Sequence, residues 1–314
     1  MKNKVLIFGI SGQDGSLLAN LLLNKGCEVL GTSRGIAGNF TNLEALGIKE
    51  KVFIHANNYI DPILLKNLLD TVAPNEIYYL SGQSSVGTSF TDPYETFISH
   101  NTVLLNILEY MRLNDSNIKL FNASSSEMFG DLDRSANEDT PFSPKSPYAV
   151  AKISAHNLTK TYRDSFNLFA CNGIVFNHES CFRSENFVTK KIILSAKKIK
   201  EGSLNELFLG DIDIIRDWGW AAEYVEAMYM MLQVKTPEDY IIGTGESNSL
   251  RDFLKISFEI YGLDYKNYVK YNPQFSRSSD LKASYADPRK AKNNLGWEAK
   301  YKMKDVIERM AMNE

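Results

Sequence analysis

Short apolar runs alternate with longer amphipathic stretches over the first 180 residues of the chain. A run of four to eight apolar residues is typical of a buried parallel strand, and apolar residues three and four apart indicate a helix. This pattern predicts strands at Val5–Phe8, Cys27–Gly31, Val52–His55, Glu76–Leu80, Ile118–Ala123 and Leu168–Phe176. It predicts helices around Leu17–Leu22, Leu64–Leu69 and Val103–Met111, and from Pro147 to Tyr162. Such alternation indicates an α/β fold with a doubly wound parallel sheet and helices on both faces.

The alternation stops near residue 177. The later pattern predicts helices at Val188–Lys200, Ala222–Leu232 and Leu250–Tyr261, strands at Leu207–Leu209 and Tyr240–Gly243, and two last helices after Asp287-Pro288. We expect a first domain at residues 1–176, completed by segments near 211–243, and a smaller C-terminal α/β lobe at 177–210 and 244–314. The five lysines of Val188–Lys200 are expected to form a solvated face rather than a nucleic-acid patch. Residues 228–231, which are Met and Tyr, are expected in the core.

Composition narrows the function. The 314 residues include 35 Lys and Arg against 38 Asp and Glu, a net charge of −3, which argues against a polybasic nucleic-acid binder. Three cysteines are too few for a disulfide framework or a thiolate zinc site, and four histidines show no ligand spacing, so no metal is expected. No apolar stretch approaches 18 residues and the N-terminus does not resemble a signal peptide, so we expect a cytoplasmic protein that binds no membrane.

Three glycines follow the first predicted strand, in the segment Gly9-Ile-Ser-Gly12-Gln-Asp-Gly15. Glycines at this spacing let the backbone turn tightly and approach a pyrophosphate, which lies at the N-terminus of the next helix. We therefore predict a Rossmann domain that binds NAD(P). The acidic residue that would contact the NAD ribose is missing from Gly31–Gly35, and Arg34 can meet a 2′-phosphate. NADP is thus favoured, with NAD as the alternative.

A second pattern predicts proton-transfer chemistry. Tyr148 and Lys152 are four residues apart on a predicted helix, so their side chains share one face. A lysine cation beside a phenol lowers the pKa of the phenol and makes it a usable base near neutral pH. Ser125 follows the strand Ile118–Ala123 and is expected at the carboxyl edge of the sheet, where ligands bind in this fold class.

These motifs resemble the extended short-chain dehydrogenase/reductase family over essentially the whole chain, and within it the GDP-mannose 4,6-dehydratase group. The segments that carry the closer resemblance are Gly9–Ser16, Leu80–Ser84, Ala123–Glu127, Ser146–Lys152, Phe176–Ser180, Asn186–Lys190, Arg216–Gly219 and Asp287–Trp297. The resemblance implies an enzyme that uses NAD(P) to oxidise C4 of a GDP-mannose-type sugar, either GDP-mannose or GDP-manno-heptose.

The resemblance also implies catalytic roles. Tyr148 would remove the proton of the C4 hydroxyl while the C4 hydride passes to the nicotinamide, with Lys152 tuning Tyr148 and Ser125 hydrogen-bonded to the C4 oxygen. Glu127 would then take the C5 proton and help expel the C6 hydroxyl as water, which leaves a 4-keto-6-deoxy sugar. Relatives that only epimerise at C4 typically carry an uncharged residue at the position of Glu127.

Binding residues are implied in the same way. Those expected at the cofactor are Gly9, Gly12, Gln13, Asp14, Gly15, Arg34, Asn57, Leu80, Ser81, Tyr148, Lys152, His178 and Arg183. Those expected at the substrate are Gln83, Ser84, Ser125, Asn177, Asn186, Lys190, Arg216 and Arg277. The helices near 94–112 and 147–164 resemble the family's four-helix interface, so at least a homodimer is expected.

The sequence departs from the family pattern in places. The chain is shorter after Arg34, and Trp220, Ser278 and Asp280 replace usual family residues where the sugar and diphosphate are expected. These changes indicate a different hexose or a heptose. A 4,6-dehydratase is the favoured function; a C4 dehydrogenase or epimerase on the same GDP-sugar class, without loss of water, is the alternative. A dinucleotide-sensing protein without enzymatic activity is the third possibility.

Overall fold

The computed structural model describes residues 2–33, 40–56, 58–275 and 280–313. The chain divides into two compact units, each assembled from three separate segments. The first unit comprises Met1–Met128, Ser146–Val175 and Val225–Tyr240, and the second comprises Phe129–Lys145, Phe176–Tyr224 and Ile241–Glu314. Residues 129–145 therefore group with the second unit.

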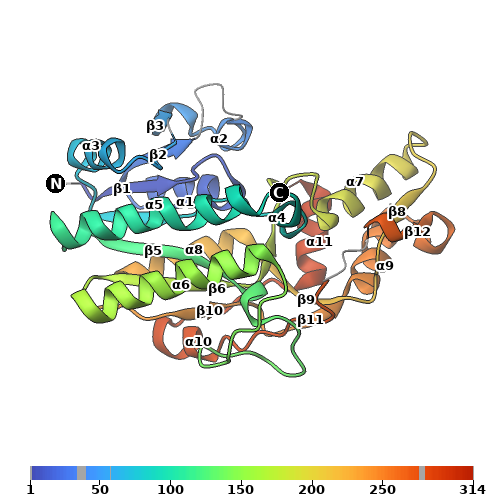
Figure 1. Cartoon of the computed structure of the whole chain (residues 1–314). Helices are drawn as coiled ribbons and strands as arrows, with labels where there is room; N and C mark the ends of the chain where they lie inside the picture. Colours follow the sequence, from blue (N-terminus) through green and yellow to red (C-terminus); the bar gives the residue numbers. More distant parts are fainter. Residues whose placement is uncertain (1, 34–39, 57, 276–279, 314) are drawn as a thin grey trace. The chain divides into compact units, whose positions relative to one another are not determined.

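A seven-stranded sheet has the strand order β10-β6-β5-β4-β1-β2-β3 (Figure 1). Its strands are β1 (Lys4–Phe8), β2 (Glu28–Ser33), β3 (Phe53–Ala56), β4 (Glu76–Tyr79), β5 (Lys119–Ser125), β6 (Ala170–Val175) and β10 (Tyr240–Ile242). Every pairing from β3 through to β6 is parallel. All four residues of β4 are buried, as expected for a strand covered on both faces. The predicted doubly wound α/β fold is confirmed.

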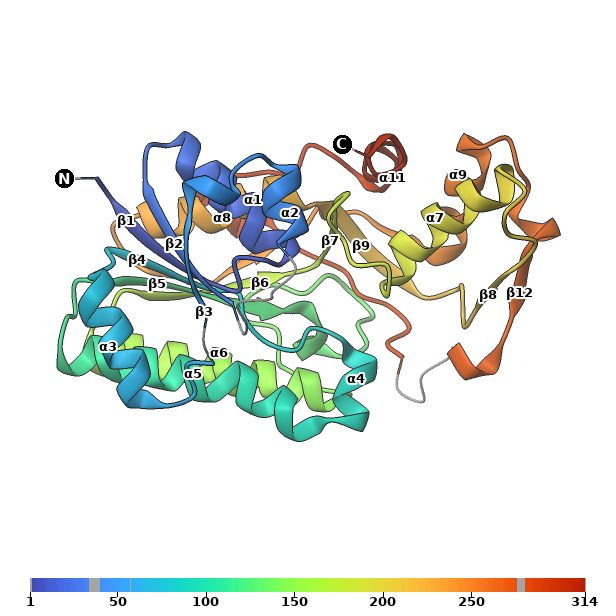
Figure 2. The same ribbon diagram turned by 90° about the horizontal axis from the view of Figure 1, so that it is seen from above.

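Helices cover both faces of this sheet, with α1 on one face and α3, α5 and α6 on the other (Figure 2). The helices of this part of the chain are α1 (Gln13–Asn24), α2 (Thr41–Ala45), α3 (Pro62–Val72), α4 (Val86–Thr91), α5 (Pro93–Leu113), α6 (Pro147–Phe166) and α8 (Ala221–Gln233). α3, α5 and α6 each begin with a proline that follows a capping Asp or Ser. This arrangement fixes where a helix starts, because the cap satisfies a backbone amide and proline lacks one. At α6 the Ser146 hydroxyl accepts from the amide of Ala149 at 3.1 Å, which places Tyr148 in the first turn.

The second unit has its own apolar core, formed mainly by residues of α7, α9 and α11 and by Trp218 and Trp220. Its main helices are α7 (Val188–Lys200), α9 (Leu250–Ile260), α10 (Arg289–Leu295) and α11 (Met303–Met312). Its strands are β7 (Asn177–Glu179), β9 (Ile215–Trp220) and β11 (Ser247–Ser249) in one sheet, and β8 (Leu207–Leu209) and β12 (Val269–Tyr271) in another.

The expected positions of two side-chain groups need correction. Lys197, Lys198 and Lys200 of α7 are exposed as predicted, but Lys190 is buried, because it lies on the same face of α7 as the core residue Ile193. Met228 and Met231 are buried in the core, whereas Tyr229 and Met230 are partly exposed. Among the described residues, no helix combines the length and the apolar character needed to cross a membrane.

Candidate active site

The glycine loop between β1 and α1 brings backbone very close to backbone. Gly9 has a φ of +88°, and a Cβ there would lie 3.1 Å from the carbonyl oxygen of Leu80. A Cβ at Gly15 would lie 2.2 Å from the carbonyl oxygen of Gly9, so no side chain fits at this position. Gly12 is the N-cap residue of α1 and has no side chain to cover the helix terminus. The loop thus fits the pyrophosphate of a dinucleotide.

Some of the other expected cofactor residues lie next to this loop, and others fall outside the described residues. The amide of Leu80 donates to the carbonyl of Phe8 at 3.0 Å, so Leu80 and Ser81, which follow β4 directly, lie beside the glycine loop. Gln13 donates through Nε2 to Asp14 at 3.1 Å in the first turn of α1. Arg34, Asn57 and Arg277, expected at the cofactor or substrate, lie outside the described residues.

Ser125 is the last residue of β5, which continues two residues beyond the predicted end at Ala123 because Ser124 and Ser125 still pair with β6. Its side chain is buried, and its Oγ accepts a hydrogen bond of 3.3 Å from the backbone amide of Glu127. Glu127 belongs to the 3₁₀ turn η2 (Ser126–Phe129) and is partly exposed. The strand end therefore presents a hydroxyl and a carboxylate two residues apart.

Tyr148 and Lys152 lie one turn apart on α6, as predicted. The Lys152 ammonium is 5.7 Å from the centre of the Tyr148 ring and donates to the carbonyl oxygen of Ala123 at 2.8 Å. Burial lowers the pKa of Lys152 to about 8, and the negative charge of Asp14 opposes this shift. A cation next to the phenol stabilises the phenolate, so this geometry suits Tyr148 to act as a base.

His100 of α5 also contacts Tyr148, and no sequence pattern identified it. Its ring centre is 5.4 Å from that of Tyr148, with an angle of 76° between the planes. Its Nε2 lies 2.8 Å from the carbonyl oxygen of Gln83, one of the expected substrate residues. Gln83 itself donates through its side chain to Ser85 at 2.7 Å, while Ser84 is exposed. A lone histidine in a helix has no sequence signal that distinguishes this role.

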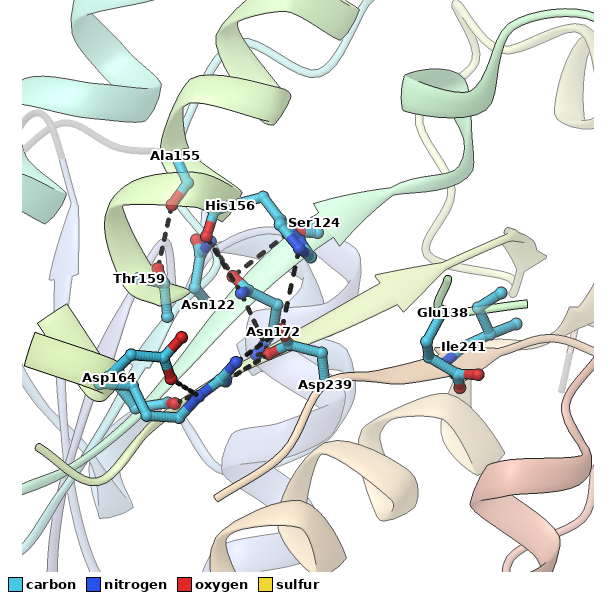
Figure 3. A network of polar contacts seen from close by, with 12 residues as sticks. Asn122, Ser124, Glu138, Ala155, His156, Thr159, Asp164, Asn172, Asp239 and Ile241 are labelled. Atoms are coloured by element: carbon cyan, nitrogen blue, oxygen red, sulfur yellow. Dashed lines mark hydrogen bonds and ion pairs between the residues drawn. The ribbon is translucent and has the colours of Figure 1, made fainter. Parts of the chain in front are cut away.

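A buried polar network lies beside Ser125 and Lys152 (Figure 3). Ser124, next to Ser125, is 3.1 Å from Nδ1 of His156, which lies one turn after Lys152 on α6. Asn172 of β6 donates to the carbonyl of His156 at 3.2 Å, and its backbone amide donates to Asp239 at 2.8 Å. Burial lowers the pKa of His156, although the charge of Asp239 opposes this shift. The network joins β5, α6 and β6 close to Ser125 and Lys152.

Asp239 completes this network through a charged pair. Arg163 donates to the two carboxylate oxygens of Asp239 at 2.6 and 2.9 Å. Burial raises the pKa of Asp239, but the hydrogen bonds and charge of Arg163 outweigh this and the net shift is downward. Paired, buried charges with bidentate geometry hold their elements in one arrangement.

Six of the expected binding residues in the second unit lie among the described residues. His178 stacks on Tyr224 with ring centres 4.6 Å apart, and its Nδ1 is 2.7 Å from the carbonyl oxygen of Phe176. Two buried cations donate to carbonyl oxygens at 2.8 Å, Lys190 to that of Cys181 and Arg216 to that of Ile215. The remaining three are Asn177, which is partly exposed, Asn186, which is exposed, and Arg183, whose Nε lies 2.9 Å from Glu179.

Comparison with known proteins decides the family. The sequence profile of the GDP-mannose 4,6 dehydratase family matches residues 6–310. The chain belongs to this family. It is 41% identical to GDP-mannose 4,6 dehydratase 1 of Arabidopsis thaliana, over 97% of this chain and 88% of that protein. It is 36% identical to GDP-mannose 4,6-dehydratase of Vibrio cholerae, over 100% of this chain and 94% of that protein.

Solved structures share the fold of this member of the GDP-mannose 4,6 dehydratase family. UDP-glucose 4-epimerase of Thermus thermophilus, solved in complex with NAD, aligns with a TM-score of 0.87 at 25% identity, over 99% of this chain and 98% of that one. dTDP-glucose 4,6-dehydratase of Bacillus anthracis aligns with a TM-score of 0.85 at 19% identity, over 99% and 96% of the two chains, which shows the fold alone. The resemblance to the extended short-chain dehydrogenase/reductase family is thereby confirmed.

Proposed function

We propose that this protein is an NAD(P)-dependent 4,6-dehydratase of a GDP-mannose-type sugar, and that it forms a 4-keto-6-deoxy sugar. The observation that carries the proposal is the placement of Glu127, whose backbone amide donates a hydrogen bond to the Oγ of Ser125 at the end of β5. Loss of water needs a group that moves the C5 proton in addition to the groups at C4. A carboxylate two residues from Ser125 supplies that group.

The glycine loop and the N-terminus of α1 would hold the dinucleotide, with Gln13 and Asp14 in the first helical turn. When bound, the nicotinamide accepts and returns the hydride that the reaction displaces. The proposal favours NADP on account of Arg34, with NAD as the alternative. The Thermus relative was solved with NAD, which supports a nicotinamide cofactor without choosing between the two.

At C4 the chain's residues handle one proton. Tyr148 as phenolate takes the proton of the C4 hydroxyl, and the buried Lys152 ammonium stabilises the phenolate through its charge. Ser125 donates a hydrogen bond to the C4 oxygen and holds the resulting ketone. The ketone makes the neighbouring C5–H acidic, which prepares the second half of the reaction.

At C5 and C6 a single carboxylate is sufficient. Glu127 as carboxylate takes the C5 proton and becomes a neutral acid. It then gives a proton to the departing C6 hydroxyl, which leaves as water and returns Glu127 to its starting form. C5 takes up a proton again when the hydride is delivered to C6, and the C4 hydroxyl proton held by Tyr148 balances that uptake. The partial exposure of Glu127 is consistent with a group that meets its partner in the bound sugar.

The second unit would bind the nucleotide diphosphate. The proposal assigns Asn177, Asn186, Lys190, Arg216 and Arg277 to the substrate, with His178 and Arg183 at the cofactor. The burial of Lys190 and Arg216 supports this, because a buried cation is stabilised by an anion. The sugar is proposed to be mannose or a manno-heptose, and the enzyme is proposed to be cytoplasmic.

A homodimer is also proposed. α5 and α6 contact each other, and several apolar side chains on α5 and α6 remain exposed. Among them are Tyr94 at 76% exposure, Phe97, Leu105, Val150 and Phe166. Apolar surface of this kind is typical of a protein interface.

Mass spectrometry of the reaction product tests the proposed reaction. We expect purified protein with NADP or NAD to convert GDP-mannose or GDP-manno-heptose into a product lighter by one water, and Tyr148→Phe to abolish conversion. A product lighter by two hydrogens would identify a C4 dehydrogenase instead. A product of unchanged mass with C4 inverted would identify an epimerase.

A further inference from the structure

His100 is a buried imidazole against the catalytic phenol, and the mechanism above gives it no role. It is 2% exposed, and its ring meets that of Tyr148 edge to face, with centres 5.4 Å apart. Aromatic rings at this separation and angle attract each other and resist reorientation. The contact therefore restricts the tilt of the Tyr148 ring.

The imidazole is itself fixed by the loop that follows β4. A carbonyl oxygen can only accept, so the 2.8 Å contact with Gln83 places a proton on Nε2 of His100. Gly82 has a φ of +131°, and a Cβ there would lie 2.1 Å from Cε1 and 2.3 Å from Nδ1 of His100. The ring thus lies directly on the backbone of Gly82, and its orientation follows that of the loop.

The surroundings of the imidazole disfavour its charged form. Burial lowers the pKa of His100 well below its usual range, the positive charge of Lys152 lowers it further, and the bond to the Gln83 carbonyl opposes both. Lys152 and Tyr148 face His100 from α6, and Gln83 faces it from the loop. Burial and the charge of Lys152 thus both act against a second positive charge beside Tyr148.

We propose that His100 is a positioning residue that fixes the phenol of Tyr148 relative to Lys152 and links its orientation to the loop Gly82–Ser85. The loop is braced against α5, because the side chain of Gln83 donates to Thr96 at 3.2 Å as well as to Ser85. A sugar that contacts Gln83 and Ser84 would therefore act on Tyr148 through His100. This inference rests on the proposed function, since it takes Tyr148 as the base.

Titration of Tyr148 tests the inference without turnover. The phenolate absorbance of each protein is compared with that of the same protein carrying Tyr148→Phe, so that the other 15 of the 16 tyrosines cancel. We expect His100→Ala to raise the pKa of Tyr148 by about one unit, a tenfold lower phenolate fraction near neutral pH. His100→Phe keeps an aromatic edge, so it should raise the pKa of Tyr148 by only about half as much as His100→Ala. Thr102→Ala, on the same helix, is the matched control and should change nothing.

Turnover gives a second readout. His100→Ala should lower kcat about tenfold with KM changed less than twofold, and His100→Phe should recover part of kcat. If His100→Ala does not fold, His100→Gln keeps a donor for Gln83 without the ring and should show the same rise in the Tyr148 pKa. An unchanged Tyr148 titration in a folded His100→Ala or His100→Gln protein would overturn the inference. If the wild-type protein turns over no GDP-sugar, but His100→Ala still raises the pKa of Tyr148, the proposed function is refuted and the positioning role of His100 stands.

Discussion

The ammonium of Lys152 donates a hydrogen bond of 2.8 Å to the carbonyl oxygen of Ala123. This bond ties the helix that carries Tyr148 to the strand that ends in Ser125, so the proposed base and the proposed C4 hydrogen-bond donor are held by one contact. The bond also places the Lys152 ammonium in the interior, and this burial lowers the pKa of Lys152 to about 8. The charge that supports the phenolate is therefore titratable within the working range of an enzyme.

The first prediction concerns the alkaline side of the pH profile. Because Lys152, whose pKa is about 8, loses its proton as the pH rises through that value, kcat should fall above it. The charge of Asp14 favours the cation, so Asp14→Asn should lower the pKa of Lys152 further and move the alkaline decline to lower pH. The measurement is kcat against pH for both proteins, with the exposed Glu44→Gln as control. An alkaline decline that stays in place in Asp14→Asn would contradict the role given to Asp14.

The second prediction separates the two halves of the reaction at Glu127. Glu127→Gln should slow loss of water by about 10²–10⁴-fold, the usual contribution of a general acid–base group. In D₂O the wild-type enzyme should place deuterium at C5, and Glu127→Gln should not, as measured by mass spectrometry. The exposed Glu226→Gln should behave as wild type. Normal C5 exchange in Glu127→Gln would assign the C5 proton to another residue.

The third prediction compares two carboxylates that contact the same arginine. Asp239 and Arg163 form a buried pair at 2.6 Å, whereas Asp164 lies 3.4 Å from Arg163 with its side chain 58% exposed. Asp239→Asn should lower the free energy of unfolding by about 3–5 kcal/mol, since it leaves Arg163 buried without its charge partner. Asp164→Asn should cost less than about 1 kcal/mol. Urea unfolding at pH 7 measures both, and equal effects would show that the buried pair stabilises the unit no more than the exposed one.

The acid side of the same pair has a defined sign. The pKa of Asp239 is lower in the folded chain than its ordinary value, so the unfolded chain takes up this proton first as the pH falls. The stabilisation is complete above the unfolded pKa and is lost as the pH falls through the folded pKa. The difference in unfolding free energy between wild type and Asp239→Asn should therefore shrink on acidification through this range.

The fourth prediction distinguishes two glycines of the cofactor loop. A Cβ at Gly15 would meet the Gly9 carbonyl oxygen at 2.2 Å, while a Cβ at Gly12 would meet it at 3.4 Å, an ordinary contact. Gly15→Ala should therefore lower the melting temperature, and Gly12→Ala should leave it within about 2 °C. Both substitutions should weaken the binding of NAD(P), since the backbone at this turn must approach the pyrophosphate. Calorimetric titration with NADP and NAD, beside thermal melting, separates damage to the fold from damage to the site.

Sequence reasoning succeeded where local chemistry determines structure. α7 and β8 have the predicted bounds, and α6 begins at the predicted Pro147, because proline and a capping serine define that start. β7, β9 and β11 were not predicted. All three contain polar residues and are stabilised by partners distant in sequence, and β7 and β11 have only three residues each. β5 extends to Ser125 for the same reason, because pairing with β6 continues through serines that carry no strand signal.

The candidate site divides in the same way. The Tyr148–Lys152 pair and the glycine loop follow from spacing within one element or one turn, which a sequence displays directly. His100 and Asp239 reach the site through tertiary packing, from α5 and from the end of the first unit's last segment. No spacing rule connects them to Tyr148 or Arg163, since Asp239 is 76 residues from Arg163. Lys190 was misplaced because a lysine in a basic helix is normally solvated.

The three-segment construction of the first unit has a consequence for synthesis on the ribosome. Arg163 and His156 emerge long before Asp239, the residue that pairs with Arg163, and the unit is completed only at Tyr240. Until then the helix bearing the proposed base has its arginine in place without the carboxylate that neutralises it. The nascent chain therefore cannot complete the fold of the first unit before Asp239 has been synthesised. A truncation before residue 239 would keep the proposed catalytic residues but lack the carboxylate that pairs with Arg163.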